Sequence, residues 1–219
     1  MSSNFVYRSV WPTDLFAARA LITKVFLRKE PLTSHVRLTE GGFHSIYDQL
    51  LGSLDYKTSI VALPKQATPV NSIDHDILAC LVTAPLDAPI DESKIDRTAI
   101  PLLGLVNDLD VWFKENVLQP RSIPESRVLH VAMGATRDDY HGKGLLGELM
   151  SQWLKEANDG RWDMAVAECT SPISRHLLKN RLGWTEGKVL KFDTFEVNGE
   201  RPFKGLEGEA ALVYKELPG

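Results

Sequence analysis

Cysteine is scarce in this chain of 219 residues, with only Cys80 and Cys169 present, far apart in the sequence. Their separation excludes the paired spacings by which cysteines hold a metal ion. Both stand in apolar, strand-like runs, where a thiol is normally buried and inert. We therefore expect neither cysteine to react, and we predict no metal site.

Long apolar runs and an excess of positive charge are also missing. No run approaches the roughly 18 residues of a membrane helix. The first fifteen residues lack a basic region followed by an apolar one, as a secretory signal would have. The net charge of −4 offers no basic field to attract nucleic acid. We expect a cytoplasmic protein whose partners are neither membranes nor nucleic acids.

The chain does have the means to build a full core. Hydrophobic residues make up 43% of the sequence, which argues against disorder. The length suits one domain spanning residues 1–219. No internal repeat or low-complexity tract divides it.

The most informative segment is 129–150, LHVAMGATRDDYHGKGLLGELM. It begins as an apolar strand, bends through Gly142-Lys143-Gly144 and continues as a helix. The helix is predicted from one apolar face, formed by Leu145, Leu146, Leu149, Met150, Trp153 and Leu154. Glycine lets a ligand oxygen approach the backbone, and the first N–H groups of a helix have no partner within it. Such a turn is suited to hold a phosphate, with Lys143 and His141 adding positive charge.

Periodicity along the chain predicts strands and helices in alternation. The predicted strands are 5–10, 56–63, 77–83, 128–133, 162–168, 189–197 and 210–217. The predicted helices are 15–26, 43–51, 102–117, the helix after the glycine turn, and 171–182. Interspersed helices together with hairpin-like strand neighbours indicate a mixed α/β (α+β) sheet.

Three kinds of phosphate-binding motif contain a glycine turn of this sort. A P-loop is excluded because Lys143 precedes Gly144 instead of following it. A dinucleotide motif fits only through Gly147, so a nucleotide-binding fold is the weaker alternative. The stretch YHGKGLLGELM resembles the acetyl-CoA loop of the GNAT (GCN5-related N-acetyltransferase) superfamily, whose pattern is Q/R-x-x-G-x-G/A. His141, Gly144 and Leu146 occupy its three key positions, so the first and third depart from it.

Further segments resemble the same superfamily, and especially its insect-type arylalkylamine branch. FLRKEPL (Phe26–Leu32) is similar to that branch's F-x-x-x-E-P-L segment, and GERPFKGL (Gly199–Leu206) is similar to its turn before the last strand. LLKNRLGW, ending at Trp184, resembles the wider family's LYEKLGF helix end. The likeness runs from about residue 4 to 217. It implies a mostly antiparallel sheet of about seven strands, flanked by helices and splayed centrally for acetyl-CoA.

The resemblance implies acetyl transfer from acetyl-CoA to an amine by direct attack, without a metal. Backbone groups of the strand before the loop would take the pantetheine arm, and those of the loop would take the pyrophosphate. In this chain the strand residues are Met133, Gly134, Ala135 and Thr136, and the loop residues are His141, Gly142, Lys143, Gly144 and Leu145. Gly147, one turn further, is expected to serve close helix packing.

The resemblance also suggests candidates for proton transfer. Glu30 of the EPL segment would act as general base through water, or else be a solvated loop residue. His130 is the rival base, because its ordinary pKa suits proton removal near neutrality, although a histidine there can also be a packed core residue. Ser171 and Ser174 open a helix near the thioester, where capping is the competing explanation. Many relatives use a tyrosine in that helix, and Lys179 stands at its position.

The resemblance implies a small-molecule primary amine as acceptor, and we expect an aryl- or alkylamine before other amines. Phe43, His44, Tyr47 and Trp112 line an aromatic pocket in one interpretation and belong to the core in the other. Other amines remain open, including an amino sugar, a polyamine or a protein N-terminus. So does a catalytically silent acyl-CoA-binding sensor, suggested by the departures at His141, Leu146 and Lys179. The sequence leaves the oligomeric state open.

Overall fold

A computed structural model describes residues 4–65 and 76–218. In these residues seven strands form one sheet in the order β1-β2-β3-β4-β5-β7-β6. All neighbours are antiparallel except β4 and β5, which run parallel. The strands are β1 (Phe5–Ser9), β2 (Ile60–Pro64), β3 (Ala79–Pro85), β4 (Val128–Thr136), β5 (Met164–Cys169), β6 (Thr185–Lys191) and β7 (Glu209–Glu216). The predicted mixed, mostly antiparallel seven-stranded sheet is confirmed.

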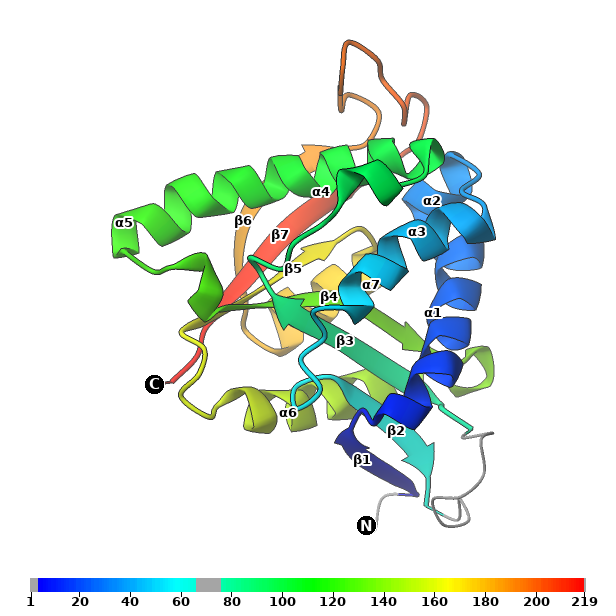
Figure 1. Ribbon diagram of the computed structural model, residues 1–219, viewed down its shortest axis with the longest axis vertical. Helices are drawn as coiled ribbons and strands as arrows, with labels where there is room; N and C mark the ends of the chain where they lie inside the picture. Colours follow the sequence, from blue (N-terminus) through cyan, green and yellow to red (C-terminus); the bar gives the residue numbers. More distant parts are fainter. Residues whose placement is uncertain (1–3, 66–75, 219) are drawn as a thin grey trace.

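Helices cover both faces of this sheet (Figure 1). On one face lie α1 (Leu15–Lys29), α2 (Pro31–His35), α3 (Glu40–Leu51) and α4 (Ile100–Phe113), which runs on through the π-helical segment η4 (Lys114–Leu118) into α5 (Gln119–Arg121). On the other lie α6 (Leu145–Ala157) and α7 (Pro172–Arg175), followed by the π-helical segment η7 (His176–Arg181). Single 3-10 turns are η1 (Pro12–Asp14), η2 (Glu92–Lys94), η3 (Arg97–Ala99), η5 (Glu125–Arg127) and η6 (Asp138–Tyr140).

A bulge divides β4 into two halves. Against β3, Thr83 faces Val131 and Val82 faces Met133, so Ala132 is an extra residue. Before the bulge, Val131 packs under α6, whereas Met133 packs on the side of α1 and α3. The odd-numbered positions of β4 therefore change sides of the sheet at Ala132.

The two parallel strands at the centre of the sheet pair over only three residues. Val128 to His130 of β4 align with Met164 to Val166 of β5. Beyond that point β4 continues to Thr136 beside β3, and β5 continues to Cys169 beside β7. Their facing edges no longer pair, which confirms the expected central splay. Backbone groups on these two edges are the ones that a sheet leaves for a ligand.

One strand lies elsewhere than predicted. The alternation in 189–197 suggested a strand there, but β6 spans Thr185–Lys191. Phe192 and Phe195 are buried because the loop after β6 folds back onto α4, in the same core cluster as Phe203. The spacing of these buried loop residues resembles the alternation of a strand, and the prediction therefore placed a strand where the loop lies. The other predicted strands and helices are present, with ends displaced by a few residues.

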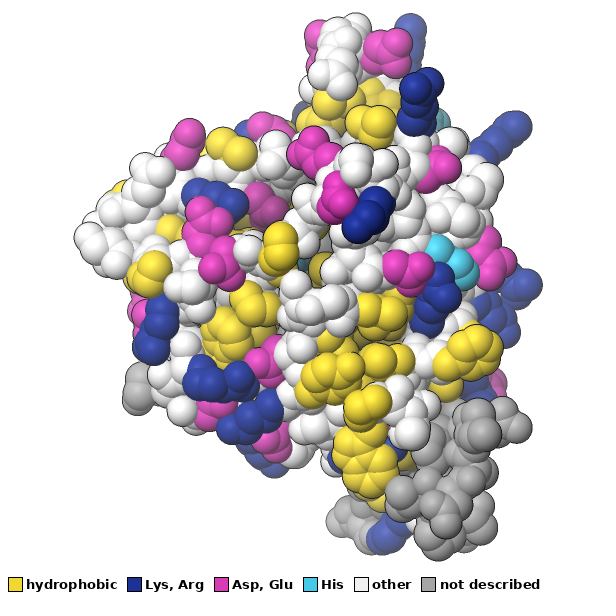
Figure 2. Space-filling view, in the orientation of Figure 1, with side chains coloured by type: hydrophobic (Ala, Val, Ile, Leu, Met, Phe, Trp, Pro, Cys, Tyr) yellow, Lys and Arg dark blue, Asp and Glu magenta, His cyan; other side chains and the backbone are white. Residues whose placement is uncertain are grey.

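Charged side chains of both signs are interspersed over the face shown in Figure 2, and hydrophobic side chains gather between them. No helix in the described part of the chain is long and apolar enough to cross a bilayer.

Candidate active site

The glycine turn leads into α6 as predicted. Gly142 and Gly144 have positive φ values of 75° and 77°, which L side chains rarely adopt. A Cβ built on either glycine would meet nothing within 4 Å, so space beside the backbone is open. Gly144 is the N-cap of α6, and no side chain caps the helix there. The first-turn N–H groups therefore face an uncrowded surface at the positive end of the helix dipole.

Charges of both signs surround this turn. The ammonium of Lys143 lies 4.4 Å from the centre of the Tyr140 ring. Lys29 forms an ion pair with Asp138, and Arg137 binds Asp139 at 2.7 Å. The Tyr140 ring also packs against Phe5 of β1, at the edge of the sheet.

The end of β4 approaches the same turn. His141 Nε2 lies 2.9 Å from the Thr136 carbonyl oxygen, which ties the strand end to the loop. Met133 and Ala135 are buried beneath α1 and α3, whereas Gly134 faces the other side, near Leu146 of α6. The structure therefore brings together the strand and loop residues that were predicted to hold acetyl-CoA.

Gly147 does not need to be glycine for close packing. A Cβ there would meet only Leu177 at 3.8 Å, an ordinary van der Waals contact.

His130 lies where β4 and β5 begin to separate, on the face covered by α4. Its Nε2 is 2.6 Å from Oε2 of Glu168 on β5, with the two side chains only 16% and 5% exposed. Burial would lower the pKa of His130, but the Glu168 carboxylate outweighs burial and raises it to about 9. At neutral pH His130 is therefore an imidazolium ion paired with a carboxylate.

Asp110 of α4 completes this group, which we call the acid cluster: Asp110, His130 and Glu168. Burial, followed by the nearby Glu168 charge, raises the pKa of Asp110 to about 8. Burial acts in the same direction on Glu168, but the His130 cation and hydrogen bonds outweigh it and lower its pKa. Sequence reasoning missed both carboxylates. Glu168 had a signal, since it is the one charged residue in the apolar strand MAVAEC.

Glu30 is a capping residue in this structure. Its two carboxylate oxygens accept the backbone N–H groups of Leu32 and Thr33, at 3.1 and 2.6 Å, at the start of α2. Leu32 packs in the same core cluster as Val128 and Val166, which flank His130. The Glu30 turn thus lies on the face of the sheet that carries the acid cluster.

The two serines are engaged with each other. Ser171 caps α7 by accepting from the Ser174 backbone N–H at 3.2 Å, and Ser174 Oγ donates to the Ser171 carbonyl at 3.0 Å. The predicted capping bond is therefore present at Ser171. Lys179, at the position of the relatives' tyrosine, pairs with Glu186 at 2.8 Å.

The aromatic candidates belong mainly to the core. Phe43 and Tyr47 of α3 are fully buried, and His44 lies 3.2 Å from the Thr23 hydroxyl. Trp112 packs against Gly187 of β6. The preferred core interpretation is confirmed for Phe43 and Tyr47.

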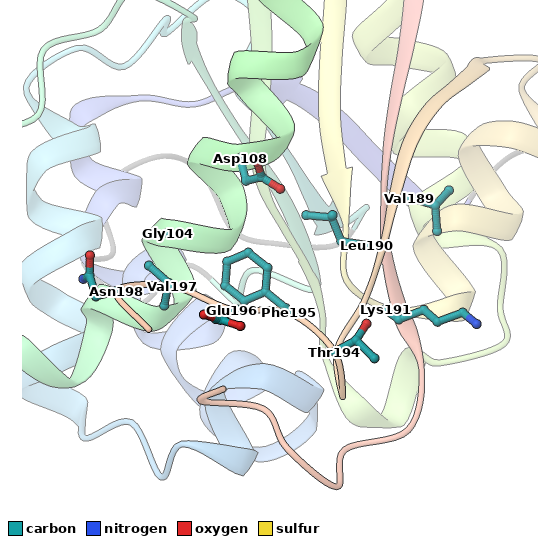
Figure 3. A pocket seen from close by; sticks show the side chains of 10 residues that line it. All are labelled: Gly104, Asp108, Val189, Leu190, Lys191, Thr194, Phe195, Glu196, Val197 and Asn198. Carbon is teal, nitrogen blue, oxygen red and sulfur yellow. The ribbon is translucent and has the colours of Figure 1, made fainter. Parts of the chain in front are cut away.

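A surface cavity of about 730 Å³ lies beside α4 and β6 (Figure 3). Its wall comes from α4, β6 and the loop after β6, with Asp108 and Phe195 among the residues that line it. None of the predicted site residues lines it.

The prediction that both cysteines are buried is confirmed. Both are buried, and burial raises each thiol pKa to about 12, so neither is a thiolate at neutral pH. In the described residues, no group of three or more His, Cys, Asp or Glu side chains could hold a metal ion.

Neither family models nor curated protein sequences match this chain. Solved structures do. The C-terminal condensation domain of Ebony, bound to β-alanyl-dopamine, superposes with a TM-score of 0.81 at 14% identity, over 97% of this chain and 99% of that one. Arylalkylamine N-acetyltransferase 2 from Aedes aegypti gives 0.74 at 18% identity, over 99% and 100%. A Drosophila melanogaster polyamine N-acetyltransferase that forms N-acetylagmatine gives 0.71 at 20%, over 97% and 100%. The chain has the GNAT fold.

Proposed function

We propose that this chain is a single-domain member of the GNAT superfamily and transfers an acetyl group from acetyl-CoA to a small primary amine. The observation that carries the proposal is the separation of β4 from β5 after His130, directly before an open glycine turn and an uncapped helix start. An extended thioester and its diphosphate need these two features side by side. Solved structures of amine N-acetyltransferases share the fold.

The described residues fit the donor at both of its ends. The N–H groups at 142–145 would take the pyrophosphate, because the space beside both glycines is open. The unpaired edge of β4 at 133–136 would take the pantetheine arm. Acetyl-CoA supplies an activated acyl carbonyl and a thiolate leaving group. The chain would orient the carbonyl and handle the protons.

Two groups on the α4 face would handle those protons. Glu30 would attract the ammonium form of the acceptor and take one proton through water, while its oxygens keep α2 capped. His130 would serve the reacting centre, since it lies at the point where the strands part. The serines at 171 and 174 would orient water near the leaving sulfur, as a minor contribution.

An aryl- or alkylamine is the proposed acceptor. An arylalkylamine N-acetyltransferase and a polyamine N-acetyltransferase both share the fold, which supports an acceptor from one of these amine classes over a sugar. Agmatine or another polyamine is the nearest competitor, because it also carries a primary amine.

A thiol-release assay tests this function. The full chain is mixed with acetyl-CoA and, separately, with tyramine-like arylalkylamines, simple alkylamines, agmatine, polyamines, an amino sugar and an N-terminal peptide. We expect release that depends on an amine and is highest for the first two classes. Release with none of them, despite thermal stabilisation by coenzyme A, would reject acetyl transfer.

A second function has a specific observation in its favour. The Glu30 carboxylate and the Ser171 hydroxyl are both occupied by capping bonds, as they would be in a protein without chemistry. A silent acyl-CoA sensor would bind coenzyme A and show no thiol release with any amine in the panel.

A further inference from the structure

The proposed reaction gives a role to His130 but none to the two carboxylates of the acid cluster, Asp110 and Glu168. Asp110 and Glu168 each keep one buried carboxylate oxygen, Oδ1 and Oε1 respectively, that has no hydrogen-bond partner in the described residues. Two buried carboxylates beside each other cannot both be ionised at low cost. A proton held between them removes this cost and gives both oxygens a partner.

We propose that Asp110 and Glu168 share one proton and together act as a positioning pair that keeps His130 protonated and oriented as the acid and base of the acyl transfer. The proposal rests on the proposed function and adds two residues to it. Glu168 binds Nε2 of the imidazolium directly, and Asp110 acts on His130 through Glu168.

The charges around His130 make this arrangement neutral overall. β5 contributes Glu168, and α4 with its continuation contributes Asp110 and Lys114. Lys114 is turned toward Glu125, which it binds at 2.8 Å. The neighbouring strand β3 places uncharged Ala84 opposite His130. With Asp110 neutral, the Glu168 anion and the His130 cation cancel, so the cluster can remain buried.

In the acyl transfer, each proton that His130 gives up is replaced. The amine nitrogen forms a bond to the acyl carbon, and the carbon–sulfur bond breaks. His130 gives its proton to the departing sulfur and takes the proton that the new amide nitrogen releases. The imidazolium is thereby regenerated, and no other reactant is needed. Because Nε2 is held by Glu168, Nδ1 is the nitrogen left for these exchanges.

Nuclear magnetic resonance of the imidazole in the full chain tests the pair without substrate. In the unsubstituted protein we expect His130 to titrate near pH 9. Glu168→Gln should lower its pKa by at least 2 units, because the carboxylate that outweighs burial is then gone. Asp110→Asn should lower it by less than 1 unit, since the amide still donates to Glu168. Titration of unsubstituted His130 at or below pH 6.5 would overturn the proposal, even if Glu168→Gln does not fold.

The kinetic arm uses a matched control on the same helix. Asp108→Asn removes a carboxylate two residues from Asp110, one that binds Lys188 at 2.9 Å outside the cluster. We expect Asp110→Asn to move the pH optimum of thiol release toward acid and Asp108→Asn to leave it in place. If Asp110→Asn changes the pKa of His130 but leaves the pH optimum of thiol release unchanged, the proposed catalytic role of His130 is overturned. His130 titrating near 9 without thiol release on any amine would overturn the proposed function, and with it that role.

Discussion

Glu30 illustrates how one side chain can serve structure and chemistry at once. Its carboxylate holds two backbone N–H groups at the start of α2, and this fixes the position of its charge. The resemblance of FLRKEPL identifies Glu30 as a candidate. It does not predict the two capping bonds, because these depend on the path of the backbone at the start of α2. These capping bonds account for the burial of its carboxylate.

Glu30→Gln separates the two roles. The amide keeps an acceptor oxygen but loses the charge, so we expect stability to fall by about 1 kcal/mol and turnover to fall by roughly tenfold or more. Denaturant unfolding and thiol release measure the two effects. Thr39→Ala is the control, because Thr39 caps α3 by accepting from Gly42 at 3.0 Å. Equal turnover in both variants would make Glu30 a cap alone.

Gly144 carries the corresponding prediction for the donor loop. Gly144→Glu adds bulk and negative charge to the open surface at the start of α6, and we expect coenzyme A binding by calorimetry to be lost. Gly160→Glu is a close control. Gly160 has the same backbone conformation, with φ of 78°, and equally open surroundings, but lies after α6. Unchanged affinity in a folded Gly144→Glu protein would contradict the loop assignment.

At the scale of elements, the contact between α4 and β6 shows what the sequence could not disclose. A Cβ on Gly187 would lie 2.4 Å from the Trp112 ring, and 3.2 Å from Leu212. Gly187 therefore permits α4 to sit directly on the sheet, next to an irregularity in the β6–β7 register. Periodicity predicts that α4 has an apolar face, but it cannot identify the strand residue that receives Trp112.

Gly187→Ala tests this contact. We expect the free energy of unfolding to fall by about 1–3 kcal/mol, because a stiff indole ring must move to make room. In a Trp112→Leu background the same substitution should cost much less. Gly147→Ala, inside α6, is the comparison: its Cβ meets only an ordinary contact, so we expect a neutral or stabilising effect. Denaturant unfolding of the four variants is the measurement, and equal cost in both backgrounds would refute the contact.

At the scale of elements, the sequence-based prediction succeeded where an apolar periodic stretch was bounded by glycine or proline. The helix after Gly144 is an example. It failed for 189–197, where buried Phe192 and Phe195 belong to a loop. It also missed the two carboxylates of the acid cluster, because Asp110 and Glu168 are distant in sequence from His130 and only the tertiary fold brings them to it.

For the whole molecule, the acid cluster predicts how stability depends on pH. The folded-state pKa values of His130 and Asp110, about 9 and about 8, lie above their ordinary values. Each group therefore contributes stability that is complete below its ordinary pKa and is lost as pH rises through the folded value. We expect the free energy of unfolding to fall by about 1–3 kcal/mol between pH 7 and 9.

Urea unfolding at stepped pH measures this loss. Asp110→Asn should flatten the curve in that interval, and Asp108→Asn should not. A stability that rises from pH 7 to 9 would contradict the charge assignment of the cluster. Above pH 9 a further decline is expected from the two buried thiols, whose pKa values are both raised to about 12.

Because of the bulge at Ala132, the even-numbered residues of β4 face different sides of the sheet before and after it. Before the bulge, His130 faces α4. After it, Gly134 faces α6, and Met133 faces α1 and α3. A substitution on α4 can therefore change the surroundings of His130 while leaving those of Met133 and Gly134 as they are. Deleting Ala132 would turn each later side chain of β4 to the opposite face of the sheet, so the length of β4 at this point decides which helices its last residues contact.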